Sequence, residues 1–221
     1  MRALIFDLDG TLIDSVYAHT YAWQRAFGEA GRPIEAWRIH RRIGMSGGQF
    51  VRALAGEIGW RVGEREAEAL ATRSGRIYAR SPLVLRALPG AVALLRDLRR
   101  QRIPHGLATS AAPGDVTKAV RPLRLPRATV IVDSGDVSAT KPEPDLFLRC
   151  REELGVPAGD CYVVGDAVWD ILAARRAGML GIGVRTGGIS GEELTAAGAF
   201  RVFRDVGELH TALEELGLRA G

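Results

Sequence analysis

The C-terminal part of the chain alternates short apolar segments with segments of helical pattern, and this alternation strongly limits how the chain can fold. The apolar segments, which we expect to form strands, are 105–109, 129–133, 161–166, 180–184 and 200–203. The segments expected to form helices are 90–102, 114–121, 143–154, 168–177 and 205–216. Apolar strands that alternate with helices are typical of a parallel sheet covered on both faces. The sequence therefore predicts an α/β fold whose site lies beyond the carboxyl ends of the strands.

One further strand is expected at the start of the chain, where three apolar residues run directly into a pair of carboxylates. Asp7 follows the apolar segment 4–6, and Asp9 follows two positions later. In an extended backbone both carboxylates point to the same face. Taken alone, the pair is compatible with a turn or a helix N-cap. Because unpartnered charge at the end of a buried strand is costly, we favour a bound cation or a reaction at this position.

Residues 15–81 show helical patterns and no strand pattern. The helices expected there span 15–31, 33–43, 46–59 and 63–80. Gly44 and the Gly47-Gly48 pair separate the second of these segments from the third. We predict a core domain formed by residues 1–14 and 82–221, with residues 15–81 as an inserted helical domain that closes near Ser81-Pro82.

Composition and charge argue against several classes of protein. The chain has 221 residues, of which 47% are hydrophobic and 25% are charged, as suits one globular domain with an insertion or two small domains. No apolar run approaches the roughly 18 residues of a membrane span, and no signal-peptide layout is present. The arginines behind the net charge of +4 are scattered over helical faces, so we expect no nucleic-acid binding. Cys150 and Cys161 lack metal-site spacing and are interpreted as packing thiols of a cytoplasmic protein.

Polar side chains that suit a metal and a phosphate follow several of the expected strands. Thr109 and Ser110 end one strand, Lys141 begins a helix, and Asp166 ends a later strand with Asp170 one helical turn beyond. Carboxylates suit Mg²⁺, whereas a hydroxyl and a lysine suit phosphate oxygens. Each residue also has a local interpretation: a cap for the Thr-Ser pair and for Asp166, a loop cation for Lys141, and helix surface for Asp170. Their joint occurrence at strand ends favours a functional site.

These residues carry a resemblance to a known family. The ordered set Asp7-Leu8-Asp9-Gly10-Thr11, Thr109, Lys141 and Gly165-Asp166…Asp170 resembles the haloacid dehalogenase-like hydrolase superfamily. The match extends over the whole chain, and it implies a Rossmann-like core with an inserted helical cap of the C1 type. Within the superfamily, the chain looks most like the branch of phosphoglycolate phosphatases and β-phosphoglucomutases.

The resemblance also implies roles for individual residues. Asp7 would attack phosphorus and form an aspartyl-phosphate, while Asp9 would act as general acid and base. Mg²⁺ would be held by the Asp7 and Asp166 side chains and by the backbone carbonyl of Asp9. Asp170 would orient a metal-bound water or Lys141. The residues that would contact the phosphate or the substrate are Thr109, Ser110, Lys141, His19, Arg41, Gly44 and Ser46.

Three observations discriminate between activities known in the superfamily. Asp9 favours phosphoryl transfer, because the cleavage of a carbon–halogen bond needs no proton donor for the leaving group. A phosphonoacetaldehyde hydrolase would need a lysine in the cap, and no lysine lies between Thr11 and Ser81. A mutase would need an arginine in the cap loop to grip a second phosphate, and Gly47 stands at the matching position.

We therefore expect a Mg²⁺-dependent phosphatase that acts on a small phosphorylated metabolite, as a monomer or weak homodimer. A β-phosphoglucomutase-like mutase stays open, because His19 matches the spacing of a mutase hinge histidine and Arg41 or Arg42 can supply a cation. A regulatory protein that has lost catalysis is a third candidate, disfavoured by the intact set of acids. The segment 185–188 is expected to form a loop near the site, with its role open.

Overall fold

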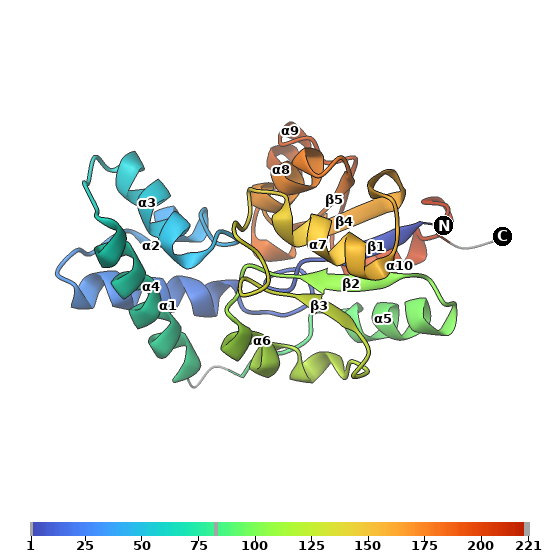
Figure 1. Cartoon of the computed structure of the whole chain (residues 1–221), viewed down its shortest axis with the longest axis horizontal. Helices are drawn as coiled ribbons and strands as arrows, with labels where there is room; N and C mark the ends of the chain where they lie inside the picture. Colours follow the sequence, from blue (N-terminus) through green and yellow to red (C-terminus); the bar gives the residue numbers. More distant parts are fainter. Residues whose placement is uncertain (1, 82–83, 219–221) are drawn as a thin grey trace. The chain divides into compact units, whose positions relative to one another are not determined.

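The computed structural model describes residues 2–81 and 84–218 (Figure 1). Pro82, where the inserted domain was expected to close, and the last three residues lie outside the described part. By its internal contacts the chain divides into two compact units, Met1–Asp14 with Leu85–Gly221 and Ser15–Val84. We call the first the core unit and the second the helical unit, and describe each by itself.

The core unit is built on one parallel sheet within the described residues. The six strands are β1 (Ala3–Phe6), β2 (His105–Ala108), β3 (Val130–Val132), β4 (Cys161–Gly165), β5 (Leu180–Val184) and β6 (Arg201–Phe203). They lie in the order β3-β2-β1-β4-β5-β6, and every neighbouring pair is parallel. This order is that of a Rossmann-type sheet, so the predicted α/β class is confirmed.

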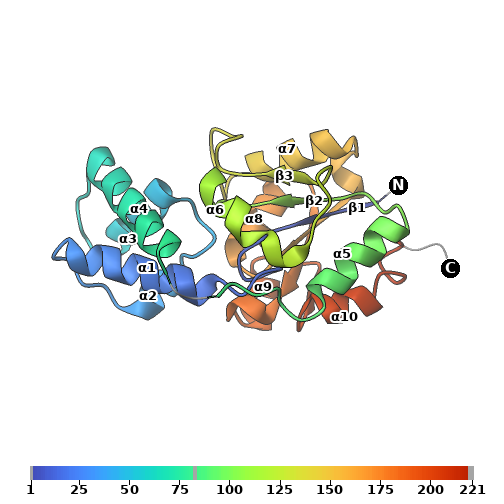
Figure 2. The same ribbon diagram turned by 90° about the horizontal axis from the view of Figure 1, so that it is seen from below.

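Alternation along β1 supplies both faces of the sheet with core residues. Leu4 and Phe6 join one apolar cluster, whereas Ala3 and Ile5 join another. The helices of this unit are α5 (Ala91–Arg100), α6 (Pro113–Ala119), α7 (Asp145–Leu154), α8 (Val168–Arg176), α9 (Gly191–Ala196) and α10 (Val206–Thr211). Side chains of α5 and α10 belong to the first cluster, and those of α7 and α8 belong to the second. Figure 2 shows α5 and α10 on one side of the sheet and α7 on the other. Because both faces are covered, β1, at the centre of the sheet, is apolar and buried at every position.

The core unit differs from the sequence prediction at two helices. The helix α9 was not predicted, because six residues are too few to show a helical period. Its start is nevertheless capped, since the Ser190 hydroxyl accepts a hydrogen bond from the Glu193 N–H at 3.1 Å. The last helix, predicted over 205–216, already ends at Thr211 and is followed by turns.

The helical unit consists of α1 (Val16–Glu29), α2 (Ala36–His40), α3 (Gly47–Glu57) and α4 (Glu64–Ala79). Aromatic rings fill its core: the Trp23 ring lies 4.3 Å from that of Phe50 and 5.6 Å from that of Phe27, between ring centroids. The helix predicted over 33–43 is shorter than expected. After His40 the backbone hydrogen bonds change to three-residue spacing, as in the bond from the Ile43 N–H to the His40 carbonyl, and the chain turns into the loop that contains Gly44.

Candidate active site

The centre of the sheet brings the ends of β1 and β4 together. These neighbouring strands lie where the strand order changes direction, which is where open α/β sheets bind ligands. Phe6 pairs with Val164, and the Asp7 N–H donates to the Val164 carbonyl at 2.8 Å. Asp7 therefore leaves β1 at the edge of the sheet where Asp166 leaves β4.

Three buried carboxylates and one buried ammonium meet at this edge. Oxygen atoms of Asp7, Asp166 and Asp170 all lie within 4.8 Å of one another. The Lys141 ammonium, fully buried, pairs with the Asp7 carboxylate and lies 2.8 Å from a carboxylate oxygen of Asp170. One ammonium cannot neutralise three carboxylates, so the fully ionised cluster has an excess of negative charge. A divalent cation would remove that excess, and oxygen ligands are those that hard cations prefer, so this group of acids can hold a metal.

The electrostatics of the cluster reflect its burial. Burial raises the pKa of Asp7 to about 7, with Asp170 and Asp9 acting in the same direction and the Lys141 ammonium opposing them. Burial likewise raises the pKa of Asp166 well above its usual range, and Asp170 adds to the effect. For Lys141, burial disfavours the charged form, but the charges of Asp170 and Asp7 outweigh it and raise the pKa of the ammonium. The cluster is therefore short of positive charge.

Hydrogen bonds hold two of the carboxylates in place. The Thr11 hydroxyl donates to a carboxylate oxygen of Asp166 at 2.8 Å, in a buried hydrogen bond between residues far apart in the sequence. The Ala167 N–H, at the start of α8, donates to the other carboxylate oxygen of Asp170 at 3.0 Å. Gly165 is required next to it, because a Cβ there would lie 2.3 Å from the Asp170 Cβ. The partnership of Thr11 with Asp166 was not foreseen from the sequence.

The structure excludes some of the local interpretations of these residues. Lys141 is not a loop cation in solvent, and Asp170 is not helix surface, because both are completely buried. Asp166 is not the cap of α8, since the N-cap position belongs to Ala167. The burial of four charged groups in one cluster is expensive unless they act on a ligand or a cation.

Thr109 and Ser110 leave β2 at the same edge of the sheet as Asp7, since Phe6 pairs with Leu107. The Thr109 hydroxyl accepts a hydrogen bond from the Ala111 N–H at 3.1 Å. One of its hydrogen-bonding positions is therefore used in a local turn. The Ser110 hydroxyl oxygen is buried and has no hydrogen-bond partner among the described residues. A buried hydroxyl without a partner is unfavourable, which makes Ser110 a candidate ligand contact.

Asp9 differs from the three clustered acids. It is half-buried and lies outside the group of three carboxylates. Gly10 follows it in the left-handed region, with φ of 82°, and its N–H donates to the Ile13 carbonyl at 2.8 Å. Glycine adopts this conformation without strain, so the turn after Asp9 can be sharp.

The remaining candidates, His19, Arg41, Gly44 and Ser46, all lie in the helical unit. The His19 ring stacks on Tyr78 with 3.9 Å between centroids. Ser46 is the residue before α3, Arg41 is exposed, and Gly44 has a φ of 103°. The structure does not group these four residues into a cluster of their own.

Two further residues of the helical unit bear on the choice between activities. Arg42, named as an alternative cation to Arg41, is paired with Glu57 at 2.6 Å, and Glu57 also pairs with Arg38. Gly47 lies against α4: a Cβ on Gly47 would lie 2.6 Å from the Ala71 Cβ. Packing therefore requires glycine at position 47, whichever activity the protein has.

The Rossmann-type sheet with an acidic, lysine-containing site at its centre defines the class of α/β protein to which this chain belongs. The sequence profile of the haloacid dehalogenase-like hydrolase family matches residues 1–178. The chain belongs to this family of hydrolases, which confirms the resemblance found in the sequence.

Known proteins of the family resemble the chain over most of its length. A phosphoglycolate phosphatase from Rhodospirillum rubrum is 33% identical over 215 residues, which cover 94% of this chain and 89% of the relative. A β-phosphoglucomutase from Bacillus subtilis is 31% identical, covering 85% of this chain and 84% of the relative. The crystal structure of a hydrolase from Pseudomonas syringae has a TM-score of 0.94 and 42% identity, covering 98% of this chain and 99% of that one.

None of the described helices combines the length and the apolar character needed to cross a bilayer.

Proposed function

We propose that this protein is a Mg²⁺-dependent phosphatase that hydrolyses a small phosphate monoester through an aspartyl-phosphate. The observation that carries the proposal is the buried group of Asp7, Asp166 and Asp170 around the Lys141 ammonium. The identity with a phosphoglycolate phosphatase over 94% of the chain supports phosphoryl chemistry. Free, buried cysteines suit a cytoplasmic protein, and a monomer or weak homodimer is proposed with it.

In the proposed reaction Asp7 is the nucleophile and Asp9 transfers protons. A carboxylate oxygen of Asp7 forms a bond to phosphorus while the bond from phosphorus to the leaving alcohol breaks, and Asp9 gives that alcohol its proton. Asp9 then takes a proton from water, whose oxygen bonds to phosphorus and displaces the Asp7 carboxylate. The products are the alcohol and inorganic phosphate, and both aspartates return to their starting state.

The other residues of the site would bind the metal and the phosphate and so offset the negative charge of the reacting groups. Mg²⁺, held by Asp7, Asp9 and Asp166, would supply positive charge against the repulsion between the Asp7 carboxylate and the phosphate. Lys141, Thr109 and Ser110 would hold phosphoryl oxygens. Asp170, whose carboxylate lies 2.8 Å from the Lys141 ammonium, would position that ammonium.

Residues of the helical unit, which we propose to be a cap, would complete the binding site for the substrate. Arg41, His19, Gly44 and Ser46 are its candidate contacts. Arg42 is a poorer candidate, because Glu57 already compensates its charge. A small ester with a carboxylate, such as phosphoglycolate, suits an arginine and a short hydroxyl side chain.

Removal of metal should stop the proposed reaction. We expect steady hydrolysis of an aryl phosphate with Mg²⁺, loss of that activity with excess EDTA, and recovery when Mg²⁺ is restored. The reason is that Asp7, buried among acids, has too little positive charge nearby to approach an anionic phosphate. Phosphate release is the measurement. Undiminished activity in EDTA would contradict the metal requirement, and inactivity in both conditions would favour a binding protein.

A mutase is the second candidate, favoured by the 31% identity with a β-phosphoglucomutase. A mutase keeps its phospho-aspartate until the sugar reorients, whereas a phosphatase discharges it to water. We expect this enzyme to release phosphate from phosphoglycolate and from glucose-1-phosphate, without a bisphosphate activator and with little isomer formed. The measurement is phosphate release against glucose-6-phosphate formation, with Asp7→Asn protein as the control for contaminating enzymes. Isomerisation faster than phosphate release would overturn the phosphatase proposal.

A further inference from the structure

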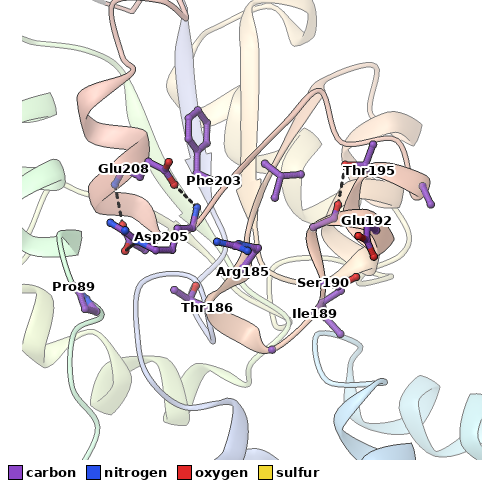
Figure 3. Close-up of a pocket in the computed structure, with 15 residues that line it drawn as sticks. Pro89, Arg185, Thr186, Ile189, Ser190, Glu192, Thr195, Phe203, Asp205 and Glu208 are labelled. Atoms are coloured by element: carbon purple, nitrogen blue, oxygen red, sulfur yellow. Dashed lines mark hydrogen bonds and ion pairs between the residues drawn. The ribbon is translucent and has the colours of Figure 1, made fainter.

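We propose that Thr186 and Gly187, in the turn after β5, are positioning residues that hold the acidic site in shape. The turn is a short 3₁₀ helix, Arg185–Gly187. Figure 3 shows Thr186 and Arg185 among the residues that line an open groove at this end of the sheet. The inference deepens the proposed function and rests on it, because it assigns residues that support the metal-binding and acid–base groups.

Gly187 makes room for the Asp166 carboxylate. A Cβ placed on Gly187 would lie 1.7 Å from a carboxylate oxygen of Asp166 and 2.6 Å from its Cγ. Both residues are buried, so neither has open space to move into. The φ of Gly187 lies outside the left-handed region, so space, not backbone conformation, requires glycine here. Any other residue would displace Asp166.

Thr186 connects the same turn to the segment that carries Asp9. Its hydroxyl donates to the Gly10 carbonyl at 2.5 Å. Gly10 lies in the left-handed turn directly after Asp9, and the next residue, Thr11, donates a hydrogen bond to Asp166. The turn after β5 therefore contacts both the segment after β1 and the acid after β4.

This arrangement gives the turn a role in catalysis without contact with substrate. Hydrogen-bonded and packed neighbours of metal ligands commonly change metal affinity by about 10- to 100-fold when they are replaced. Displacement of reacting groups by about 1 Å is enough to lower rates by roughly 100-fold. We assign Gly187 to the placement of Asp166 and Thr186 to the placement of the Asp9 turn.

The first test replaces Gly187 by alanine and measures Mg²⁺ binding by calorimetry, independently of activity. We expect the dissociation constant for Mg²⁺ to rise at least about tenfold. Gly191→Ala is the matched control, because a Cβ there would meet its nearest atoms at 3.6 Å, an ordinary contact. That variant should bind Mg²⁺ like the wild type. Binding by Gly187→Ala within twofold of wild type would overturn the assignment.

A double-mutant cycle separates the contact with Asp166 from a general loss of stability. Without metal, Gly187→Ala should lower the melting temperature in the wild-type background and have a much smaller effect in an Asp166→Ala background, where the carboxylate is gone and only the Asp166 Cβ, 2.9 Å away, remains close to the new Cβ. If Gly187→Ala alone does not fold, the double variant should. Equal destabilisation in both backgrounds, or failure of both to fold, would overturn the proposal. The cycle needs no turnover, so its outcome is separate from the fate of the phosphatase proposal.

The second test removes the Thr186 hydroxyl. We expect Thr186→Val to lower kcat about tenfold with KM little changed, and Thr186→Ser, which keeps the donor, to restore kcat. Thr195→Val is the control: its hydroxyl also donates to a backbone carbonyl, that of Gly191 at 2.8 Å, but the bond lies within α9 and does not touch the acidic site. Equal kcat values for Thr186→Val and Thr195→Val would overturn the role of Thr186.

Discussion

Replacement of Asp7 by asparagine should abolish phosphate-monoester hydrolysis while the protein stays folded. The amide is close in size to the carboxylate but is a poor nucleophile and a poor metal ligand, so we expect kcat to fall by about 10⁴-fold or more. The measurement is phosphate release at saturating Mg²⁺. Asp14→Asn, a change at an exposed carboxylate of the same segment, is the control and should keep its activity. Turnover of Asp7→Asn near that of wild type would show that Asp7 is not the nucleophile.

The burial of Asp7 can be tested by comparing how the melting temperatures of Asp7→Asn and wild type depend on pH. Burial raises the pKa of Asp7 from 3.8 to about 7, so in metal-free protein the ionised carboxylate costs folding free energy as the pH rises through this interval. Asparagine removes that cost. The melting temperature of Asp7→Asn relative to wild type should therefore increase between pH 4 and pH 7 and level off above it. A difference that shrinks over this range would contradict the conclusion that ionising the buried Asp7 carboxylate costs folding free energy.

Replacement of Lys141 by arginine should cause a severe loss of activity although the positive charge is kept. The Lys141 side chain is completely buried, and its compact ammonium lies between the carboxylates of Asp7 and Asp170. The planar guanidinium is larger and needs a different arrangement of acceptors, so it displaces both acids. We expect kcat to fall by about 10²- to 10³-fold, as for the loss of one charge-stabilising group.

The chain offers a matched control for this change, because Lys118 is its only other lysine. Lys118 is exposed on α6, and Lys118→Arg should keep wild-type kcat. If Lys141→Arg is unstable, Lys141→Met, which keeps the length of the side chain without its charge, should be inactive as a folded protein. A folded Lys141→Arg enzyme with turnover within a few-fold of wild type would contradict a role for Lys141 in the site.

Local patterns in the sequence determined the class of fold and the family. Apolar segments alternating with helical ones require a sheet that is covered on both faces, and the parallel sheet confirms it. The two-residue spacing of Asp7 and Asp9, together with the order of Thr109, Lys141 and Asp166 along the chain, identified the hydrolase family. These features are readable because each depends on neighbouring residues or on the order of strands.

The tertiary structure decided which of these residues meet and what supports them. It placed the Lys141 ammonium between two carboxylates, one of which, on Asp170, had an equally good interpretation as helix surface. It showed Thr11 as the partner of Asp166, and Gly187 as the space that Asp166 needs. Such pairs are separated by many residues and leave no periodic pattern. They exist because parallel strands end at one edge of the sheet, where close packing brings distant segments within hydrogen-bonding distance.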